Sequence, residues 1–448
     1  MAKPHIKLVN ILKDGSLTRQ LNMPGLIAFG GDSYELMVVS NDRKVPVCNE
    51  CGGPALNYGT FDRELIDITT VDGKKQFTRL HYYFYKYRCI EKHNPDCGIF
   101  RKDLDFVNEN ARTTRRYEDE IVKRLMFKSI DKVREDLLEY VLPGHEDDII
   151  SKPAISKLIK RWVYERDSAR KFSTPSNVWI YAYVAFNHSY TTICEKKDGK
   201  LILLEVLPEI SVSSIQQFFS KMDVDAIWEV TIDCNSVVYD AVKQIFPDRK
   251  IGVDTDALKY EVEKEYDDFV YEIAKNYSKV VRENLRSDGV NLDPADSAKI
   301  YQLRIKYPML KSAYKQYSSL YAILDRHLEI YNAQEWSQDL SDKKENIFVY
   351  TLLYIKEYWS EIVNFYKRRH DVSGSTYEKI YELNQLIENY FPVCTDDTFR
   401  ARMLYPRMDD LRATGSWKGI PVDDLLDILN EMITEGGLKE HERKRRKD

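Results

Sequence analysis

Several features that would assign a protein to a specialised class are missing from this chain of 448 residues. No apolar run approaches the roughly 18 residues of a membrane-spanning helix. The opening residues, Met1–Ile6, have no basic flank followed by an apolar stretch. Low-complexity segments and internal repeats are absent too. The length predicts several domains, and these absences predict a cytoplasmic protein without a membrane partner. A net charge of −5 argues, taken alone, against nucleic acid.

Cysteine is scarce as well, and the positions of the seven cysteines are informative. Four lie early in the chain, Cys48 and Cys51 in one short segment and Cys89 and Cys97 in another. Apolar and aromatic runs flank Val71–Lys74, which contains an Asp-Gly step, and this pattern predicts a hairpin between the two segments. The hairpin would bring the two cysteine pairs together.

Two short cysteine loops joined by a hairpin are the arrangement with which a zinc ribbon binds Zn²⁺. We therefore predict a structural zinc ion held by these four thiolates, because four protein ligands leave no open position for catalysis. His93 is an alternative to Cys97 as the fourth ligand, and four ordinary buried thiols are the simpler alternative. The remaining cysteines are expected to be isolated core residues: Cys194, Cys234 and Cys394.

The segment after the cysteines has the pattern of three short helices. Apolar residues recur at helical spacing over 117–128 and 130–141, and Ser151 and Pro153 introduce a third helix that runs to Lys171. From Ser151 to Lys171 there are seven basic and two acidic residues. This order fits a helix-turn-helix that reads duplex DNA, and a solvated basic face is the alternative. The side chains predicted to contact DNA are Lys152, Lys157, Lys160, Arg161 and Arg166.

The middle of the chain predicts an α/β sheet. Three successive strand-like runs are followed by alternating helices and strands, which is the order of an RNase-H-like domain. The expected strands are 178–183, 189–195, 200–207, 227–232 and 250–253, with helices at 211–222 and 237–245. Beyond this region the chain is helical and rich in tyrosine to about His370.

In this order the segments resemble transposases of bacterial insertion sequences of the ISL-three type. The resemblance rests on Trp228–Lys259 (WEVTIDCNSVVYDAVKQIFPDRKIGVDTDALK), on Leu203–Pro208, and on a last helix within 375–404. It implies a DDE domain in which three carboxylates hold two Mg²⁺ or Mn²⁺ ions for phosphoryl transfer. It also implies double-stranded DNA as partner, a homodimer and a place near the bacterial nucleoid.

Only one of the three implied carboxylates stands at its expected position. Asp233 matches the second acid, whereas the first acid should lie at about Ile180 or Tyr181, and no Asp or Glu occurs in the 25 residues from Arg170 to Cys194. The third position aligns with Tyr381. Three acids are candidates to replace the missing carboxylate: its neighbour Glu382, Glu378 one turn earlier, and Asp254 after the fifth strand. A solvated acidic face is the alternative. The segment 223–272 carries fourteen acidic and five basic residues, which repels phosphate.

We therefore predict a multidomain α+β transposase-family protein that binds specific duplex DNA and has a degenerate catalytic domain. An active transposase using Asp233, Asp254 and Glu382 with Mg²⁺ or Mn²⁺, and a zinc-stabilised interaction scaffold, are the alternatives. The expected parts are a zinc ribbon (1–105), a helix-turn-helix (106–172), the first part of an RNase-H-like core (173–257), an all-α insertion (258–372), and the final helix with a basic tail (373–448).

Overall fold

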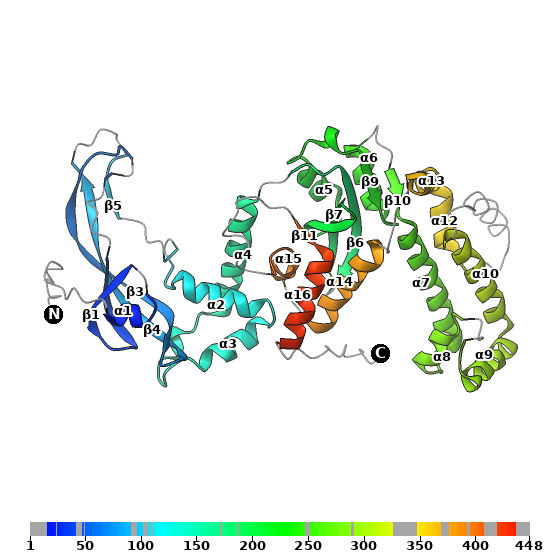
Figure 1. The fold of residues 1–448 in the computed structure, drawn as a ribbon, viewed down its shortest axis with the longest axis horizontal. Helices are drawn as coiled ribbons and strands as arrows, with labels where there is room; N and C mark the ends of the chain where they lie inside the picture. The colour runs from blue at the N-terminus through cyan, green and yellow to red at the C-terminus, as the bar shows by residue number, and fades with distance from the viewer. Residues whose placement is uncertain are drawn as a thin grey trace. The chain divides into compact units, whose positions relative to one another are not determined.

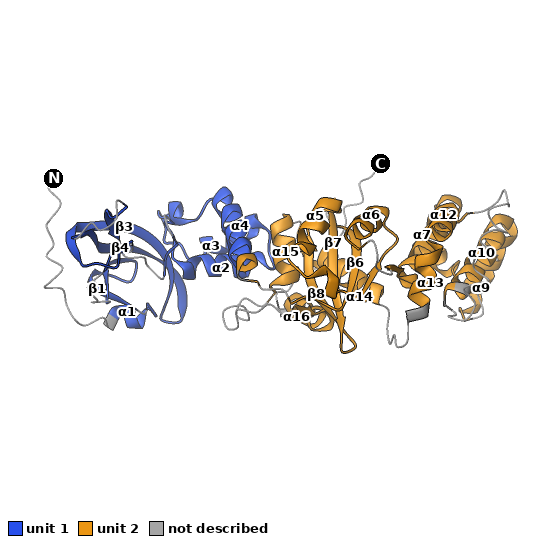
Figure 2. Ribbon diagram, turned by 90° about the horizontal axis from the view of Figure 1, so that it is seen from above, with its two compact units in different colours: residues 1–165 blue, residues 166–448 orange. Residues whose placement is uncertain are grey.

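The computed structural model divides the chain into two compact units, 1–165 and 166–448 (Figure 2). It describes residues 16–23, 25–41, 47–48, 50–90, 96–101, 106–108, 111–170, 173–185, 188–246, 251–287, 291–325, 347–368, 376–391, 395–406 and 419–435. His93, Cys394, Lys171 and the basic tail therefore lie outside the described residues. Across the described segments, no helix has the length and apolar character needed to span a membrane.

The first unit contains a mixed sheet built around the expected hairpin (Figure 1). Its elements are α1 (Ser16–Gln20), β1 (Leu26–Gly31), β2 (Glu35–Ser40), β3 (Ala55–Val71), β4 (Lys74–Cys89) and β5 (Ile99–Arg101). The strand order is β1-β2-β4-β3, and β5 pairs with β4. Asp72 and Gly73 both have positive φ, as a tight hairpin turn requires. The local turn chemistry thus explains why β3 and β4 pair over their whole length.

Three helices follow in the first unit, as predicted. They are α2 (Arg115–Leu125), α3 (Ile130–Leu138) and α4 (Lys152–Ala169), with a 3-10 turn, η2 (Glu146–Asp148), before α4. Apolar side chains at helical spacing along α4 are buried, including both Trp162 and Val163. Tyr117 of α2 packs edge-to-face on Phe77 of β4, with ring centroids 5.1 Å apart. Because the apolar face of each helix is packed against the unit, its polar face is directed toward solvent.

The second unit contains a six-stranded sheet, counted over the described residues. Its strands are β6 (Asn177–Ala185), β7 (His188–Lys197), β8 (Lys200–Leu207), β9 (Glu229–Ile232), β10 (Ile251–Val253) and β11 (Ile420–Pro421). The order is β10-β9-β6-β7-β8-β11, with β6, β9 and β10 parallel and β6 to β8 antiparallel. The first five of these strands correspond to the five predicted strands and follow one another in the predicted order. The edge strand β11 was not predicted, because two residues give no alternation pattern.

Helices surround this sheet and extend beyond it (Figure 1). Near the sheet are α5 (Val212–Phe219), a 3-10 turn η3 (Val224–Ala226), α6 (Ser236–Ile245), α14 (Thr376–Tyr390), α15 (Asp396–Leu404) and α16 (Val422–Glu435). The chain between the fifth strand and α14 forms α7 (Thr255–Ala274), α8 (Lys279–Asn284), α9 (Pro294–Lys306), α10 (Pro308–Asp325), α12 (Val349–Glu357) and α13 (Trp359–Arg368). The helical region predicted between strand five and the last helix is thus present.

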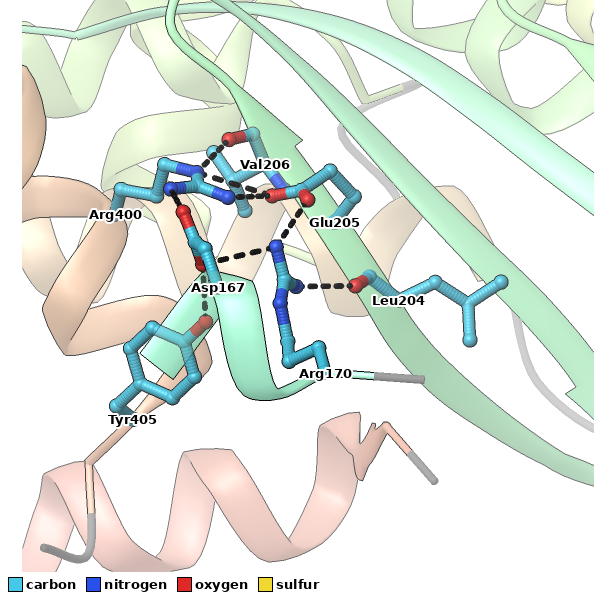
Figure 3. Close-up of polar contacts among 7 residues, drawn as sticks. All are labelled: Asp167, Arg170, Leu204, Glu205, Val206, Arg400 and Tyr405. Carbon is cyan, nitrogen blue, oxygen red and sulfur yellow. Dashed lines mark hydrogen bonds and ion pairs between the residues drawn. The ribbon is translucent and has the colours of Figure 1, made fainter. Parts of the chain in front are cut away.

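The last residues of α4 belong to the second unit, where buried ion pairs hold them (Figure 3). Arg170 donates to Glu205 of β8 at 2.5 Å, and both side chains are 2% exposed. Arg400 of α15 donates to the other oxygen of Glu205 at 2.8 Å and also pairs with Asp167. Tyr405 donates to Asp167 as well. Removing one partner from such a buried set costs about 3–5 kcal/mol, so the cluster fixes the end of α4 to β8 and α15.

Candidate functional sites

The four early cysteines converge at the end of the β3–β4 hairpin. Cys89 ends β4 and pairs in register with Ala55, and the loop containing Cys48 and Cys51 leads directly into β3. That loop turns tightly, because Gly52 has a φ of 69° and its N–H donates to the Cys48 carbonyl at 2.8 Å. Pairing of β5 with β4 returns the chain after Cys97 to the same end. Strand register therefore delivers both cysteine pairs to one place.

The sulfur geometry fits a tetrahedral metal ion. The Sγ atoms of Cys48 and Cys97 are 3.7 Å apart, those of Cys51 and Cys89 are 3.5 Å apart, and all four lie within 4.8 Å of one another. A tetrahedron with Zn–S bonds of about 2.3 Å has edges of about 3.8 Å. The backbone N–H of Cys51 lowers the pKa of the Cys48 thiol to about 7, which favours the thiolate that a metal needs. The donor set suits Zn²⁺.

The expected catalytic positions lie on three adjacent strands of the second unit. Ile180 of β6, Ile232 of β9 and Val253 of β10 are in register, so the residues that follow them project from the same face of the sheet. Those residues are Tyr181, Asp233 and Asp254. The position implied for the first acid is therefore occupied by a tyrosine next to Asp233.

Asp233 is buried, and backbone N–H groups occupy both of its carboxylate oxygens. One oxygen accepts from Ala182 of β6, and the other accepts from Asn235 at 3.1 Å, just before α6. Burial raises the pKa of Asp233 to about 7, against the effect of these two hydrogen bonds, and the nearby charges of Glu261 and Asp254 raise it further. The carboxylate is thus poorly stabilised as an anion.

Asp254 is likewise engaged by internal partners. The Tyr181 hydroxyl donates to one of its oxygens at 2.7 Å, and the N–H of Asp256 donates to the other at 3.0 Å, which caps α7. Tyr181 is fully buried, and burial together with the charge of Asp254 raises its pKa well above the ordinary value. The tyrosine stays neutral and acts as a hydrogen-bond donor where the resemblance implies a carboxylate.

The third expected acid is not drawn into this group. Glu382 and Glu378 of α14 are both exposed. Tyr381 instead packs on Tyr260 of α7, with ring centroids 4.8 Å apart. Tyr377, one turn before it, packs on Tyr181 at 5.7 Å. Aromatic side chains of α14 therefore pack between Tyr181 and Tyr260 of α7.

Among the described residues, the four cysteines are the only group of three or more His, Cys, Asp or Glu side chains close enough to share one ion. Asp233, Asp254 and Glu382 do not form such a group there. Sequence reasoning missed Glu261 of α7, whose charge acts on Asp233. Asp254 is the N-cap of α7, and Glu261 lies two turns later in the same helix. This helical spacing from Asp254 was the signal in the sequence that could have indicated Glu261.

The basic residues predicted on α4 have different environments. Lys157 and Lys160 are exposed. Arg161 donates to Glu118 of α2 at 2.6 Å, and Glu118 is buried and also accepts from Thr113 at 2.9 Å. Lys152 is exposed and paired with Asp131, and Arg166 is half-buried. Lys152, Lys157 and Lys160 are therefore all exposed on α4, and Arg161 joins α4 to α2.

The chain was compared with models of protein families. A family model described as a transposase, of the DDE and ISL-three type, matches residues 183–389. This match begins within β6, two residues after Tyr181, and supports a transposase of that type. No curated protein matches the chain.

Proposed function

We propose that this protein is a transposase-type DNA-binding protein whose catalytic domain is impaired. The observation that carries the proposal is Tyr181, which lies beside Asp233 at the first-acid position and whose hydroxyl donates a hydrogen bond to Asp254. A phenol with a raised pKa supplies neither the charge nor the second oxygen with which a carboxylate bridges two metal ions.

The residues around Asp233 do not fit a pair of Mg²⁺ ions. Its two oxygens accept from backbone N–H groups, and Asp254 caps α7 and accepts from Tyr181. A metal ion would compete with these hydrogen bonds for the carboxylate oxygens, each bond being worth about 0.5–1.5 kcal/mol or more for charged acceptors. These residues therefore do not provide the metal pair that DNA cleavage requires.

DNA binding is proposed for the first unit. A zinc ion held by the four cysteines would stabilise the end of the hairpin, and α4 would enter the major groove with Lys157 and Lys160 facing the DNA. Arg161 would position α4 through Glu118 without contacting DNA. The resemblance further implies a homodimer on paired DNA ends.

A gel-shift titration of the full chain tests this proposal. The probes are the DNA that flanks the gene and an unrelated duplex of equal length, each at two salt concentrations. We expect tighter binding to the flanking DNA, weakened about tenfold or more by Lys157→Ala/Lys160→Ala, because each lost phosphate contact reduces the salt-dependent affinity. Equal binding to both probes, or full binding by the double variant, contradicts the proposal.

A further inference from the structure

The four early cysteines differ in how far solvent reaches them. Cys48 and Cys89 are buried, 2% and 3% exposed, whereas Cys51 and Cys97 are half-buried. A Cβ atom added to Gly52, which follows Cys51, would meet no atom of the described residues within 4 Å beyond its own chain neighbours, so the space beside Cys51 is open. A small solute therefore reaches the sulfur atoms of the half-buried residues first.

Each half-buried sulfur has a buried sulfur of the other cysteine segment beside it. The Sγ atom of Cys51 lies 3.5 Å from that of Cys89, and the Sγ atom of Cys97 lies 3.7 Å from that of Cys48. Cys48 and Cys51 precede β3, whereas Cys89 ends β4 and Cys97 follows it. We call Cys51–Cys89 and Cys48–Cys97 the two cross-segment pairs. Each therefore combines one sulfur that solvent reaches with one that the fold shields.

The backbone around these sulfur atoms is held by its own hydrogen bonds. The N–H of Cys48 donates to the Gly53 carbonyl and the N–H of Gly52 donates to the Cys48 carbonyl, both at 2.8 Å. The N–H of Cys89 donates to the Gly98 carbonyl at 3.4 Å. A disulfide bond is about 2.05 Å long, so the sulfur atoms of either pair need to approach by only about 1.5 Å to form one. Small movements of the side chains supply this approach while the backbone keeps its place.

We propose that the two cross-segment pairs are sites of reversible oxidation by a hydroperoxide. The half-buried sulfur of each pair is the one that the oxidant attacks, and the buried sulfur closes the disulfide. An accessible thiolate with a second thiol beside it is the arrangement that reacts in this way. The inference rests on the zinc site of the proposed function, because binding to the metal keeps the sulfur atoms as thiolates.

The reaction has two balanced steps. First, the electron pair of the half-buried thiolate attacks the outer oxygen of the hydroperoxide and the O–O bond breaks. The sulfur becomes a sulfenic acid, and the departing oxygen takes a proton and leaves as an alcohol, or as water where the oxidant is hydrogen peroxide. Second, the buried thiolate attacks that sulfur, the S–O bond breaks, and hydroxide leaves and is protonated to water. Each disulfide thus consumes one hydroperoxide and two protons, and the zinc ion loses two thiolate ligands.

The test treats the zinc-loaded full chain with hydrogen peroxide. A chromogenic chelator reports released zinc, and peptide mass spectrometry without reduction, after blocking of the remaining thiols, identifies the cross-links. We expect zinc release with Cys51–Cys89 and Cys48–Cys97 cross-links, both reversed by dithiothreitol. Cross-links within one segment, Cys48–Cys51 or Cys89–Cys97, or no cross-link at all, overturn the inference. A reduced chain that binds no zinc overturns the zinc site of the proposed function instead, and its cross-links still decide this inference.

Two matched double substitutions separate the roles of the sulfur atoms. Cys51→His/Cys97→His and Cys48→His/Cys89→His each leave two thiolates and two imidazoles, a donor set that also binds Zn²⁺. We expect the first variant to release zinc about tenfold more slowly in peroxide, because only the second keeps the thiolates that the oxidant reaches. Equal rates overturn the inference. If either variant holds no zinc, trapping of sulfenic acid by dimedone in the wild-type chain decides instead: label at Cys51 and Cys97 supports the inference, and label at Cys48 or Cys89 overturns it.

Discussion

The two regions that carry chemistry-bearing residues are built in opposite ways. At the end of the β3–β4 hairpin, four sulfur atoms gather within 4.8 Å. At the ends of β9 and β10, next to Tyr181 of β6, Asp233 and Asp254 lie on one face of the sheet, and each of their carboxylate oxygens accepts a hydrogen bond from within the protein. In the first region the potential metal ligands converge on one point. In the second region the carboxylates are hydrogen-bonded to donors of the protein itself.

The difference shows that proximity of acids does not make a metal site. A tetrahedral thiolate site needs only that loop geometry place soft ligands at about 3.8 Å spacing. A two-metal site also needs carboxylate oxygens left open to the ions and a negative charge that burial does not oppose. We propose that this site lacks the needed charge, because Tyr181 is neutral, and that internal hydrogen bonds compete with an ion for the oxygens of Asp233 and Asp254.

The largest effect on metal content and stability is expected from mutation of the cysteine site. We expect Cys89→Ser to lose bound zinc and to unfold the hairpin end, because structural Zn²⁺ contributes on the order of 10 kcal/mol in small zinc modules. Cys194→Ala is the matched control and should keep zinc, since Cys194 lies in the sheet of the second unit. Metal content and hydrogen exchange over 50–90 measure both. A protein that purifies without metal yet keeps this protection contradicts the prediction.

The next effect concerns the pH dependence of the buried carboxylate. The pKa of Asp233 is about 7 in the folded chain and roughly 3.9 when unfolded, so folding favours its protonated form. Wild-type stability should therefore fall relative to Asp233→Asn as the pH rises from about 4 to about 7, by at most about 4 kcal/mol at about 1.4 kcal/mol per pKa unit. Urea unfolding across this range measures it. A rise relative to the variant would show an ionised, stabilised carboxylate.

A smaller effect separates structural from DNA-contacting cations on α4. Arg161→Ala should lower the free energy of unfolding by about 2 kcal/mol, because it leaves buried Glu118 with fewer donors. That figure is below the usual cost for a fully buried pair since Arg161 is about one-third exposed. Lys157→Ala should leave stability within about 0.5 kcal/mol and weaken DNA binding. Equal stability of the two variants would contradict the assignment.

The smallest effect is expected at the tyrosine itself. Tyr181→Phe removes the hydrogen bond to Asp254 and should cost about 1 kcal/mol without creating metal affinity. Tyr181→Asp adds a carboxylate beside Asp233 and should make the melting temperature rise with Mn²⁺. Thermal unfolding with and without Mn²⁺ compares both with wild type. A wild-type response to Mn²⁺ that Asp233→Asn abolishes would show that the site already binds metal.

Local chemistry explains which parts of the molecule were predictable. The Asp-Gly turn and flanking alternation predicted the hairpin, and the absence of acids before Cys194 predicted the missing first carboxylate. The hydrogen bond between Tyr181 and Asp254 joins residues 73 positions apart, and no local sequence pattern indicates it. Register between distant segments is set by packing, which a single sequence does not display.

Strand nicking tests the central claim most directly. Wild-type protein, Asp233→Ala and a reaction without protein are incubated with DNA that carries the flanking ends, in Mg²⁺ and in Mn²⁺, and nicked strands are quantified. Because Tyr181 occupies the first-acid position, we expect wild type and Asp233→Ala to give the same background level. Nicking by wild type that disappears in Asp233→Ala would contradict the account and establish an active catalytic domain.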